Sequence, residues 1–425
     1  MHQATHQAIA ALWRIESARV VAVLARMVRD IGLAEDLAQD ALLAALEHWP
    51  RDGMPDKPGA WLMATAKHKA LDHLRHARMQ GEKLEALGHD LDAQEALIAP
   101  DFVDALDAAR ADEIGDDLLR LIFSACHPLL ATEARVALTL KLLGGLSTAE
   151  IARAFLVPEA TVAQRIVRAK RSLREARVPF ELPRGAVLGE RLGSVLEVVY
   201  LIFNEGYTAT TGADWMRPAL TDEALRLGRM LAALAPAEPE VLGLLALMEL
   251  QASRAAARVD AQGRPVLLAE QDRSRWDRLL IRRGLAALER ATLLSDQLRQ
   301  PLACYALQAA IAACHARAPS AADTDWPAIA GLYDALAQAA PSPVVELNRA
   351  VAVGMAFGPA AGLAIIDALR DEPALRHYQW LPSVRADLLG KLGRHEEARA
   401  EWANAAALAG NARERELLLA RAKGD

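Results

Sequence analysis

Cysteine and aromatic residues are scarce in this chain. Three cysteines occur among 425 residues, and Phe, Trp and Tyr together make up 4% of the sequence. Cys126, Cys304 and Cys314 are too few and too scattered for a disulfide framework. Cys126-His127 and Cys314-His315 lack a second ligand pair at zinc spacing, so we expect buried or neutral thiols and no metal site.

Long apolar runs are also missing. No stretch approaches the length and hydrophobicity of a membrane span, and the N-terminus is charged from Arg14 onward with no apolar signal region. These absences predict a cytoplasmic chain without a membrane partner.

A catalytic set is missing as well. Polar residues cluster at Asn204, Glu205 and Tyr207 and in the segment 269–276, yet neither cluster pairs a nucleophile with a base or gathers metal ligands. We expect buried polar networks or a partner surface there, and a protein that is not an enzyme and needs no cofactor.

The composition that is present favours helices. Alanine and leucine dominate, and hydrophobic residues make up 53% of the chain, which is ample for buried cores. The length suggests two to four domains. We therefore predict an all-α, multi-domain protein.

The formal net charge of −6 conceals an uneven distribution. Residues 81–120 carry twelve acids and three bases, whereas residues 131–178 carry nine bases and four acids. A basic module thus lies beside an acidic connector, which predicts an anionic partner for the basic module alone.

The basic module contains the pattern around which the chain is organised, residues 147–177. Ser147 and Glu150 form an S-x-x-E capping box at a helix start. Pro158 ends that helix and suits the start of the next, with Glu159 in its first turn. Two helices joined by a short turn are the structure of a helix-turn-helix.

The second helix of this pattern divides into two faces. Its apolar stripe is Val162, Ile166, Ala169 and Leu173. The rest of its surface carries Arg165, Arg168, Lys170, Arg171, Arg174 and Arg177, with Glu175 as a late acid. Such a helix rests on a core by one face and offers cations to DNA by the others, although a solvated surface helix shares the pattern.

The chain contains two motifs, one made of the segments 35–40, 58–62 and 70–75 and the other of the segments 146–152, 160–162 and 168–174. They resemble region 2 and region 4, respectively, of the extracytoplasmic-function (ECF) sigma factors of bacterial RNA polymerase. The resemblance covers roughly the first 180 residues. It implies a helical region 2 bundle over 1–80, an acidic linker over 81–117 and a region 4 helix-turn-helix over 118–180.

The same resemblance assigns site residues. The region 2 helix that docks on the clamp of the polymerase β′ subunit corresponds to Asp36, Leu37, Gln39 and Asp40. The helix facing the −10 element carries Trp61, Lys67, His68, Lys69, Asp72 and Arg75. The helix reading the −35 element carries Glu159, Ala160, Thr161, Gln164, Arg165, Arg168, Lys170, Arg171 and Arg174. The linker either occupies the basic RNA channel of the polymerase or is a solvated tether.

The remaining residues, 187–425, predict a helical C-terminal domain. Ala398, Trp402 and Ala405 follow Ala361, Ile365 and Ala368 at a constant offset, similar to tetratricopeptide (TPR) repeats with a lengthened loop. Such arrays bind peptides or other domains, so we expect a protein or peptide partner and control of the sigma activity. Two other functions fit the sequence: a TPR scaffold with an ordinary helix-turn-helix, and a helix-turn-helix regulator that senses a ligand or partner.

Overall fold

The computed structural model describes residues 2–79, 107–155, 157–208, 216–260, 264–410 and 412–423. Within these ranges the regular structure is helical, and an isolated bridge between Val259 and Pro265 is the one β-type pairing. The predicted all-α class is confirmed. The chain forms two compact units, 1–199 and 200–425, whose boundary falls inside one helix, α9 (Ala186–Tyr207).

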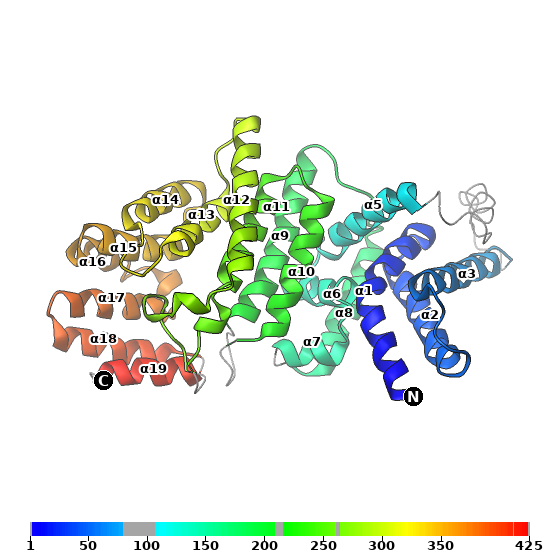
Figure 1. Cartoon of the computed structure of the whole chain (residues 1–425), viewed down its shortest axis with the longest axis horizontal. Coiled ribbons are helices and arrows are strands. Elements are labelled where there is room, and N and C mark those ends of the chain that lie inside the picture. Colours follow the sequence, from blue (N-terminus) through cyan, green and yellow to red (C-terminus); the bar gives the residue numbers. More distant parts are fainter. Residues whose placement is uncertain are drawn as a thin grey trace. The chain divides into compact units, whose positions relative to one another are not determined.

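The first part of unit 1 is a bundle of four helices (Figure 1). They are α1 (His2–Val28), α2 (Ile31–Asp52), α3 (Pro58–Met79) and α5 (Asp107–Ala125). Ile9, Trp49 and Leu62 form part of its core. α2 continues through Pro50 and ends before Gly53, whose φ of 89° lets the chain turn and whose N–H donates to the Trp49 carbonyl at 3.1 Å.

A buried ion triad attaches α5 to α1. Asp117 is 1% exposed, and it accepts hydrogen bonds from Arg26 Nε at 2.9 Å and Arg120 Nη1 at 2.6 Å. Burial raises the pKa of Asp117, and the two guanidinium groups offset part of that rise. Residues 107–117, which were expected to belong to the acidic linker, form the first part of α5. Residues 80–106 lie outside the described ranges.

The second part of unit 1 contains α6 (Thr132–Leu142), α7 (Thr148–Phe155) and α8 (Glu159–Glu175). The capping box at the start of α7 is present in both directions: Ser147 N–H donates to Glu150 Oε2 at 2.8 Å, and Glu150 N–H donates to Ser147 Oγ at 3.1 Å. The apolar stripe predicted for α8 is buried at all four positions, namely Val162, Ile166, Ala169 and Leu173. The helix-turn-helix geometry follows from these two local signals.

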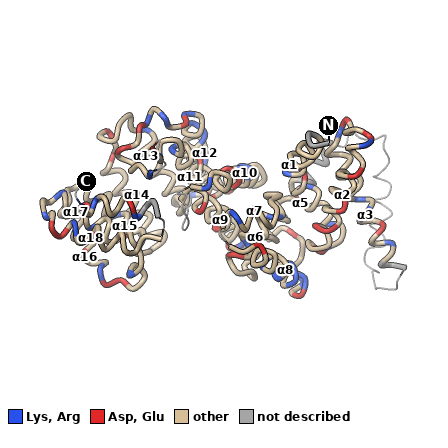
Figure 2. Tube along the Cα trace, turned by 90° about the horizontal axis from the view of Figure 1, so that it is seen from below, with Lys and Arg blue, Asp and Glu red and all other residues tan. Residues whose placement is uncertain are grey.

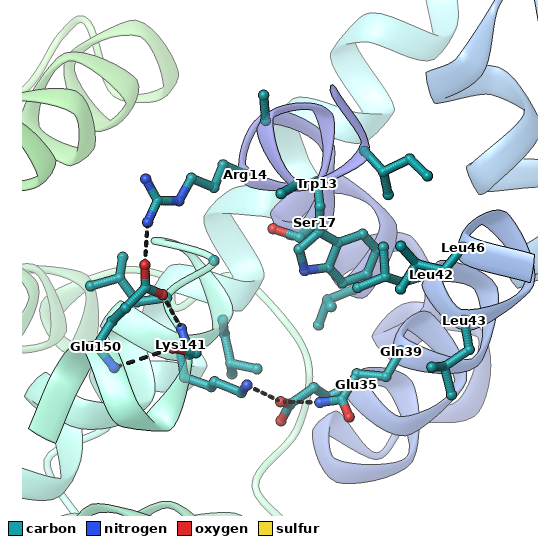
Figure 3. Close-up of a pocket in the computed structure, with 18 of the residues that line it drawn as sticks. Trp13, Arg14, Ser17, Glu35, Gln39, Leu42, Leu43, Leu46, Lys141 and Glu150 are labelled. Carbon is teal, nitrogen blue, oxygen red and sulfur yellow. Dashed lines mark hydrogen bonds and ion pairs between the residues drawn. The ribbon is translucent and has the colours of Figure 1, made fainter. Parts of the chain in front are cut away.

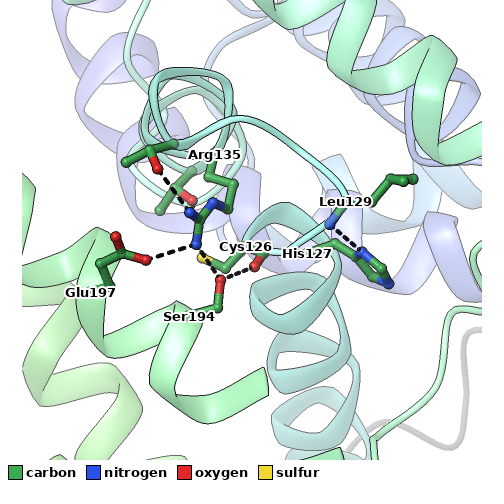
Figure 4. A network of polar contacts seen from close by, with 8 residues as sticks. Cys126, His127, Leu129, Arg135, Ser194 and Glu197 are labelled. Carbon is green, nitrogen blue, oxygen red and sulfur yellow. Dashed lines mark hydrogen bonds and ion pairs between the residues drawn. The ribbon is translucent and has the colours of Figure 1, made fainter. Parts of the chain in front are cut away.

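A network around Arg135 joins the first half of α9 to α6 (Figure 4). Arg135 is 9% exposed and donates to Ser194 Oγ at 2.5 Å, Glu197 Oε2 at 2.9 Å and Thr132 Oγ1 at 2.8 Å. Ser194 Oγ in turn donates to the Cys126 carbonyl at 2.6 Å. These contacts compensate the burial of a charged guanidinium.

Unit 2 is an array in which successive helices pack on one another. The first members are α10 (Pro218–Leu234), α11 (Pro239–Ala252), α12 (Arg278–Leu298) and α13 (Cys304–Arg317). The later members are α14 (Trp326–Ala339), α15 (Pro343–Phe357), α16 (Pro359–Ala368), α17 (Trp380–Lys391), α18 (His395–Leu408) and α19 (Ala412–Lys423). Short 3-10 turns lie at Ala255–Ala257, Leu268–Glu270, Arg273–Arg275 and Pro373–Leu375.

The TPR-like pattern falls on equivalent helices of this array. Ile365 belongs to α16 and Trp402 to α18, and each of these helices packs on the one before it, α15 and α17. Gly362 allows a close approach of α16 to α15, because a Cβ there would lie 2.6 Å from the Ala350 carbonyl oxygen.

All three cysteines lie within the described residues. Cys126 is buried, and burial raises its pKa to about 11, so the thiol is neutral. Cys304 and Cys314 are partly buried and unpaired. Across the described ranges no helix combines the length and the hydropathy needed to cross a bilayer.

Candidate nucleic-acid and protein interfaces

The N-terminal half of α8 presents polar side chains away from the buried stripe. Glu159, Ala160, Gln164 and Arg168 are exposed, and Thr161 and Arg165 are half-buried. In the described residues neither Arg165 nor Arg168 has an ion-pair partner. This end of the helix is therefore free to offer hydrogen-bond donors to an anionic ligand.

The C-terminal half of α8 is engaged within unit 1. Lys170 Nζ pairs with Glu35 of α2, and Arg174 lies 3.9 Å from Asp30, the residue that caps the N-terminus of α2. Arg171 pairs with Glu175 at 2.6 Å, in the same helix. Three of the cations predicted to contact DNA are thus neutralised by carboxylates in this structure.

Glu35 is the centre of the contact between α2 and the basic module. It is 4% exposed, and its carboxylate also lies 3.6 Å from Lys141 Nζ of α6 and accepts a hydrogen bond from Gln39 Nε2 at 2.8 Å. Lys141 and Lys170 keep 23% and 19% of their side-chain surface exposed. One buried carboxylate therefore holds two ammonium groups and is itself held by a residue of the predicted polymerase surface.

A second ion pair joins α1 to the start of α7. Arg14 Nη2 lies 2.5 Å from Glu150 Oε1, while the other oxygen of Glu150 serves the capping box. Burial raises the pKa of Glu150, but the N–H and hydroxyl of Ser147 and the charge of Arg14 outweigh burial and lower the pKa overall. The carboxylate is consequently ionised at neutral pH.

A cleft of about 830 Å³ lies between these contacts (Figure 3). Its apolar lining includes Trp13, Leu42 and Leu46, and its polar lining includes Arg14, Glu35 and Glu150. Figure 3 shows the Glu35 and Glu150 carboxylates on the side of the cleft nearer the basic module. The four-helix bundle and the module of α6, α7 and α8 meet here, and the cleft is the space that their side chains leave open.

The outward face of α2 is acidic, as expected. Asp36, Gln39 and Asp40 are exposed, and Leu43 beside them is 56% exposed. Leu37, which was grouped with the surface residues, is 7% exposed and belongs to the core. Its place in the polymerase contact stays a prediction, because in this structure the side chain points inward.

The exposed face of α3 carries the predicted polar residues. His68, Asp72 and Arg75 are exposed and Lys67 and Lys69 are half-buried, with Arg75 and Asp72 paired at 3.4 Å. Trp61 is half-buried, and its ring contacts that of Trp49 edge-on, with centroids 5.3 Å apart. In this structure Trp61 therefore packs edge-on against the core of the bundle.

Sequence reasoning missed the residues that hold α8 against α2. Asp30, Glu35 and Lys141 were not singled out, because Glu35 and its two lysines lie far apart in the chain. The one local signal was the position of Glu35, an acid next to the apolar face of α2. The charges of α8 and α2 can be followed in Figure 2.

Three family descriptions match successive parts of the chain. Residues 12–79 match sigma-70 region 2, residues 120–173 match sigma-70 region 4, and residues 191–292 match a family of unknown function, DUF6596. The first two matches cover the acidic α2, the basic α3 and the helix-turn-helix. The third covers most of α9 and reaches into α12.

Several curated proteins are similar to the chain. "Uncharacterized protein R00370" of Rhizobium meliloti is 45% identical over 93% of this chain and 90% of its own length. The "Probable RNA polymerase sigma-C factor" of Mycobacterium bovis is 30% identical over 36% of this chain and 75% of its own length. The "Probable ECF RNA polymerase sigma factor SigI" of Mycobacterium tuberculosis is 31% identical over 41% of this chain and 57% of its own length. No solved structure matches.

Proposed function

This chain belongs to the ECF sigma factors and carries a helical C-terminal extension, and from that premise we propose that it binds core RNA polymerase, recognises −10 and −35 promoter elements and starts transcription there. Sigma factors are transcription initiation factors and not enzymes. The chemistry to be explained is therefore recognition of a protein and of DNA.

The division of α8 into a buried stripe and an exposed polar end carries the proposal. Four apolar residues fix the helix on its module, which leaves Gln164, Arg165 and Arg168 facing outward. Arg and Gln side chains make the bidentate contacts with guanine and adenine by which the major groove is read. We assign the −35 element to this end, with Lys170, Arg171 and Arg174 as phosphate contacts once their ion pairs open.

The acidic face of α2 suits the polymerase. Asp36, Gln39 and Asp40 are exposed on one helix without serving the core, and exposed Leu43 adds apolar area. Carboxylates around an apolar contact complement a basic protein surface and steer its approach. The clamp of the β′ subunit is the partner that the family resemblance proposes for this face.

The exposed face of α3 is proposed for the −10 element. His68, Lys69 and Arg75 provide charge and hydrogen-bond donors along one helix. Trp61, packed on Trp49, anchors the start of α3 so that these side chains are presented from a fixed helix. Unit 2 is proposed to modulate the activity in the cytoplasm through a protein or peptide partner.

One experiment with two variants tests these assignments. Asp36→Arg with Asp40→Arg reverses the acidic face, and we expect association with core polymerase to be lost while helicity by circular dichroism is unchanged. Arg165→Ala with Arg168→Ala is the matched variant, which should keep core binding and lose promoter binding. Because this end is assigned to base contacts, the variant should lose discrimination between the −35 element and other sequences, by roughly 1–3 kcal/mol for each base contact removed. Unchanged retention of polymerase by the first variant would contradict the proposed surface.

A further inference from the structure

Exposed arginines gather on α12, in the segment that matches the family of unknown function. Arg278, Arg282, Arg283 and Arg290 are all exposed. The buried face of the same helix is Ile281, Gly284, Ala287, Leu288, Ala291 and Ser295. At 100° per residue the four arginines lie within one broad arc opposite that buried face. We call these four residues the α12 arginine ridge (Figure 2).

Among the described residues, no member of the ridge has a carboxylate partner within 4 Å, whereas several other arginines of unit 2 do. Arg226, Arg349 and Arg394 pair with carboxylates at 2.7, 2.9 and 2.7 Å. Glu289 is the acid between its members, so residues 278–290 carry four positive charges and one negative charge. This part of the helix is strongly cationic in a chain whose net charge is −6.

The placement of the ridge opposes the stability of α12. Three of its arginines lie in the first six residues of the helix, and the first turn contains no acid. Cations at a helix N-terminus interact unfavourably with the macrodipole, and like charges four residues apart, such as Arg278 and Arg282, repel each other. Asp277 caps the helix by accepting from Leu279 and Leu280 N–H at 2.8 and 3.1 Å, so one acid offsets part of this effect.

We propose that the α12 arginine ridge binds the phosphate backbone of DNA, as a contact additional to those of unit 1. Arginine is suited to this partner because its planar guanidinium pairs with phosphate oxygens in a bidentate manner. From Arg278 to Arg290 the helix extends about 18 Å, which spans about five base-pair steps. The contact reads no bases, and it adds affinity for DNA that does not depend on sequence. It does not depend on the assignment of α8 to the −35 element.

The test compares full-length proteins on a short duplex of arbitrary sequence across a salt series. Replacing Arg278, Arg282, Arg283 and Arg290 with Gln should weaken binding at least tenfold at low salt and lower the salt slope by up to about 3.6 units, at about 0.9 per phosphate. Replacing the same four with Lys should retain most of the slope. The matched control replaces Arg226, Arg264, Arg349 and Arg394 with Gln, which removes equal charge from arginines that have carboxylate partners.

Thermal unfolding supplies the second measurement. Since the Gln substitutions on the ridge relieve repulsion, the melting temperature should stay constant or rise while DNA affinity falls, which separates lost contacts from lost fold. Equal slopes for the ridge variant and the control would overturn the proposal. A ridge variant that binds DNA normally but loses core polymerase would also overturn it, and would assign the ridge to an acidic protein surface.

Discussion

The buried carboxylate of Glu35 leads to the sharpest prediction about how unit 1 opens. Glu35→Gln keeps the shape of the side chain and removes the charge that holds Lys141 and Lys170. Breaking a buried ion pair by removing one partner costs about 3–5 kcal/mol. Both lysines here are about one-fifth exposed and can regain water. We therefore expect the substitution to destabilise the closed arrangement, in which α8 packs on α2, by about 2–3 kcal/mol.

That energy corresponds to a shift of about 30- to 150-fold toward an arrangement in which α8 is released from α2. Apparent affinity rises with the fraction of molecules that can bind DNA. In the absence of polymerase, the Glu35→Gln protein should therefore bind a short duplex more tightly than the unchanged protein, by up to the same factor of about 30 to 150. Fluorescence anisotropy of labelled DNA at fixed salt measures it. The thermal unfolding temperature should fall, because the closed contact also stabilises unit 1.

Glu47→Gln is the matched control, because Glu47 lies on the same helix and is exposed. It removes the same charge and should leave both DNA affinity and melting temperature unchanged. Lys141→Gln should increase DNA affinity by a smaller factor, since Lys141 lies at 3.6 Å and outside α8. If Glu35→Gln lowers the melting temperature and binds DNA no better than the control, the contact only stabilises the fold and the reasoning is refuted.

Two further predictions concern unit 2. Burial, with the nearby charges of Arg254 and Arg273, lowers the pKa of His315 to about 4, so the unfolded chain takes up a proton at this residue below its ordinary pKa of about 6.5. The contribution of His315 to stability should therefore be full above pH 6.5 and fall by about 3 kcal/mol as the pH drops to 4. His315→Asn should reduce this fall, which urea titrations at several pH values measure. Gly362→Val should lower the free energy of unfolding by about 2–3 kcal/mol because its side chain would meet the Ala350 carbonyl, whereas Gly390→Ala, at a helical glycine with open space, should cost nothing or stabilise slightly in the same denaturant titration.

Local patterns predicted the helix-turn-helix well. The stripe from Val162 to Leu173 and the capping box of Ser147 and Glu150 depend on residues three to eleven apart, so periodicity and capping chemistry sufficed. Leu37 belongs to the motif expected to bind the polymerase, yet its side chain is buried in the core, because a motif does not say which way each side chain points.

The contacts between distant segments could not be predicted in this way. Glu35 meets Lys141 and Lys170 only because two separately formed modules pack together, and no spacing in the sequence encodes that meeting. Trp61 also meets Trp49 only through tertiary packing, although the two rings lie on consecutive helices of one bundle. The ridge on α12 was visible as sequence, but its lack of carboxylate partners was visible only in the structure.

The Arg135 network determines where the chain can be divided. Ser194 and Glu197 belong to α9, beyond the segment similar to region 4, yet they satisfy a guanidinium buried in α6. A protein shortened at Pro183 would leave that charge without two of its partners, so any loss of activity would combine a damaged DNA-binding module with a missing extension. Retaining all of α9, to Thr208, preserves the hydrogen bonds. The smallest separable piece of this sigma factor is therefore longer than its resemblance to shorter relatives suggests.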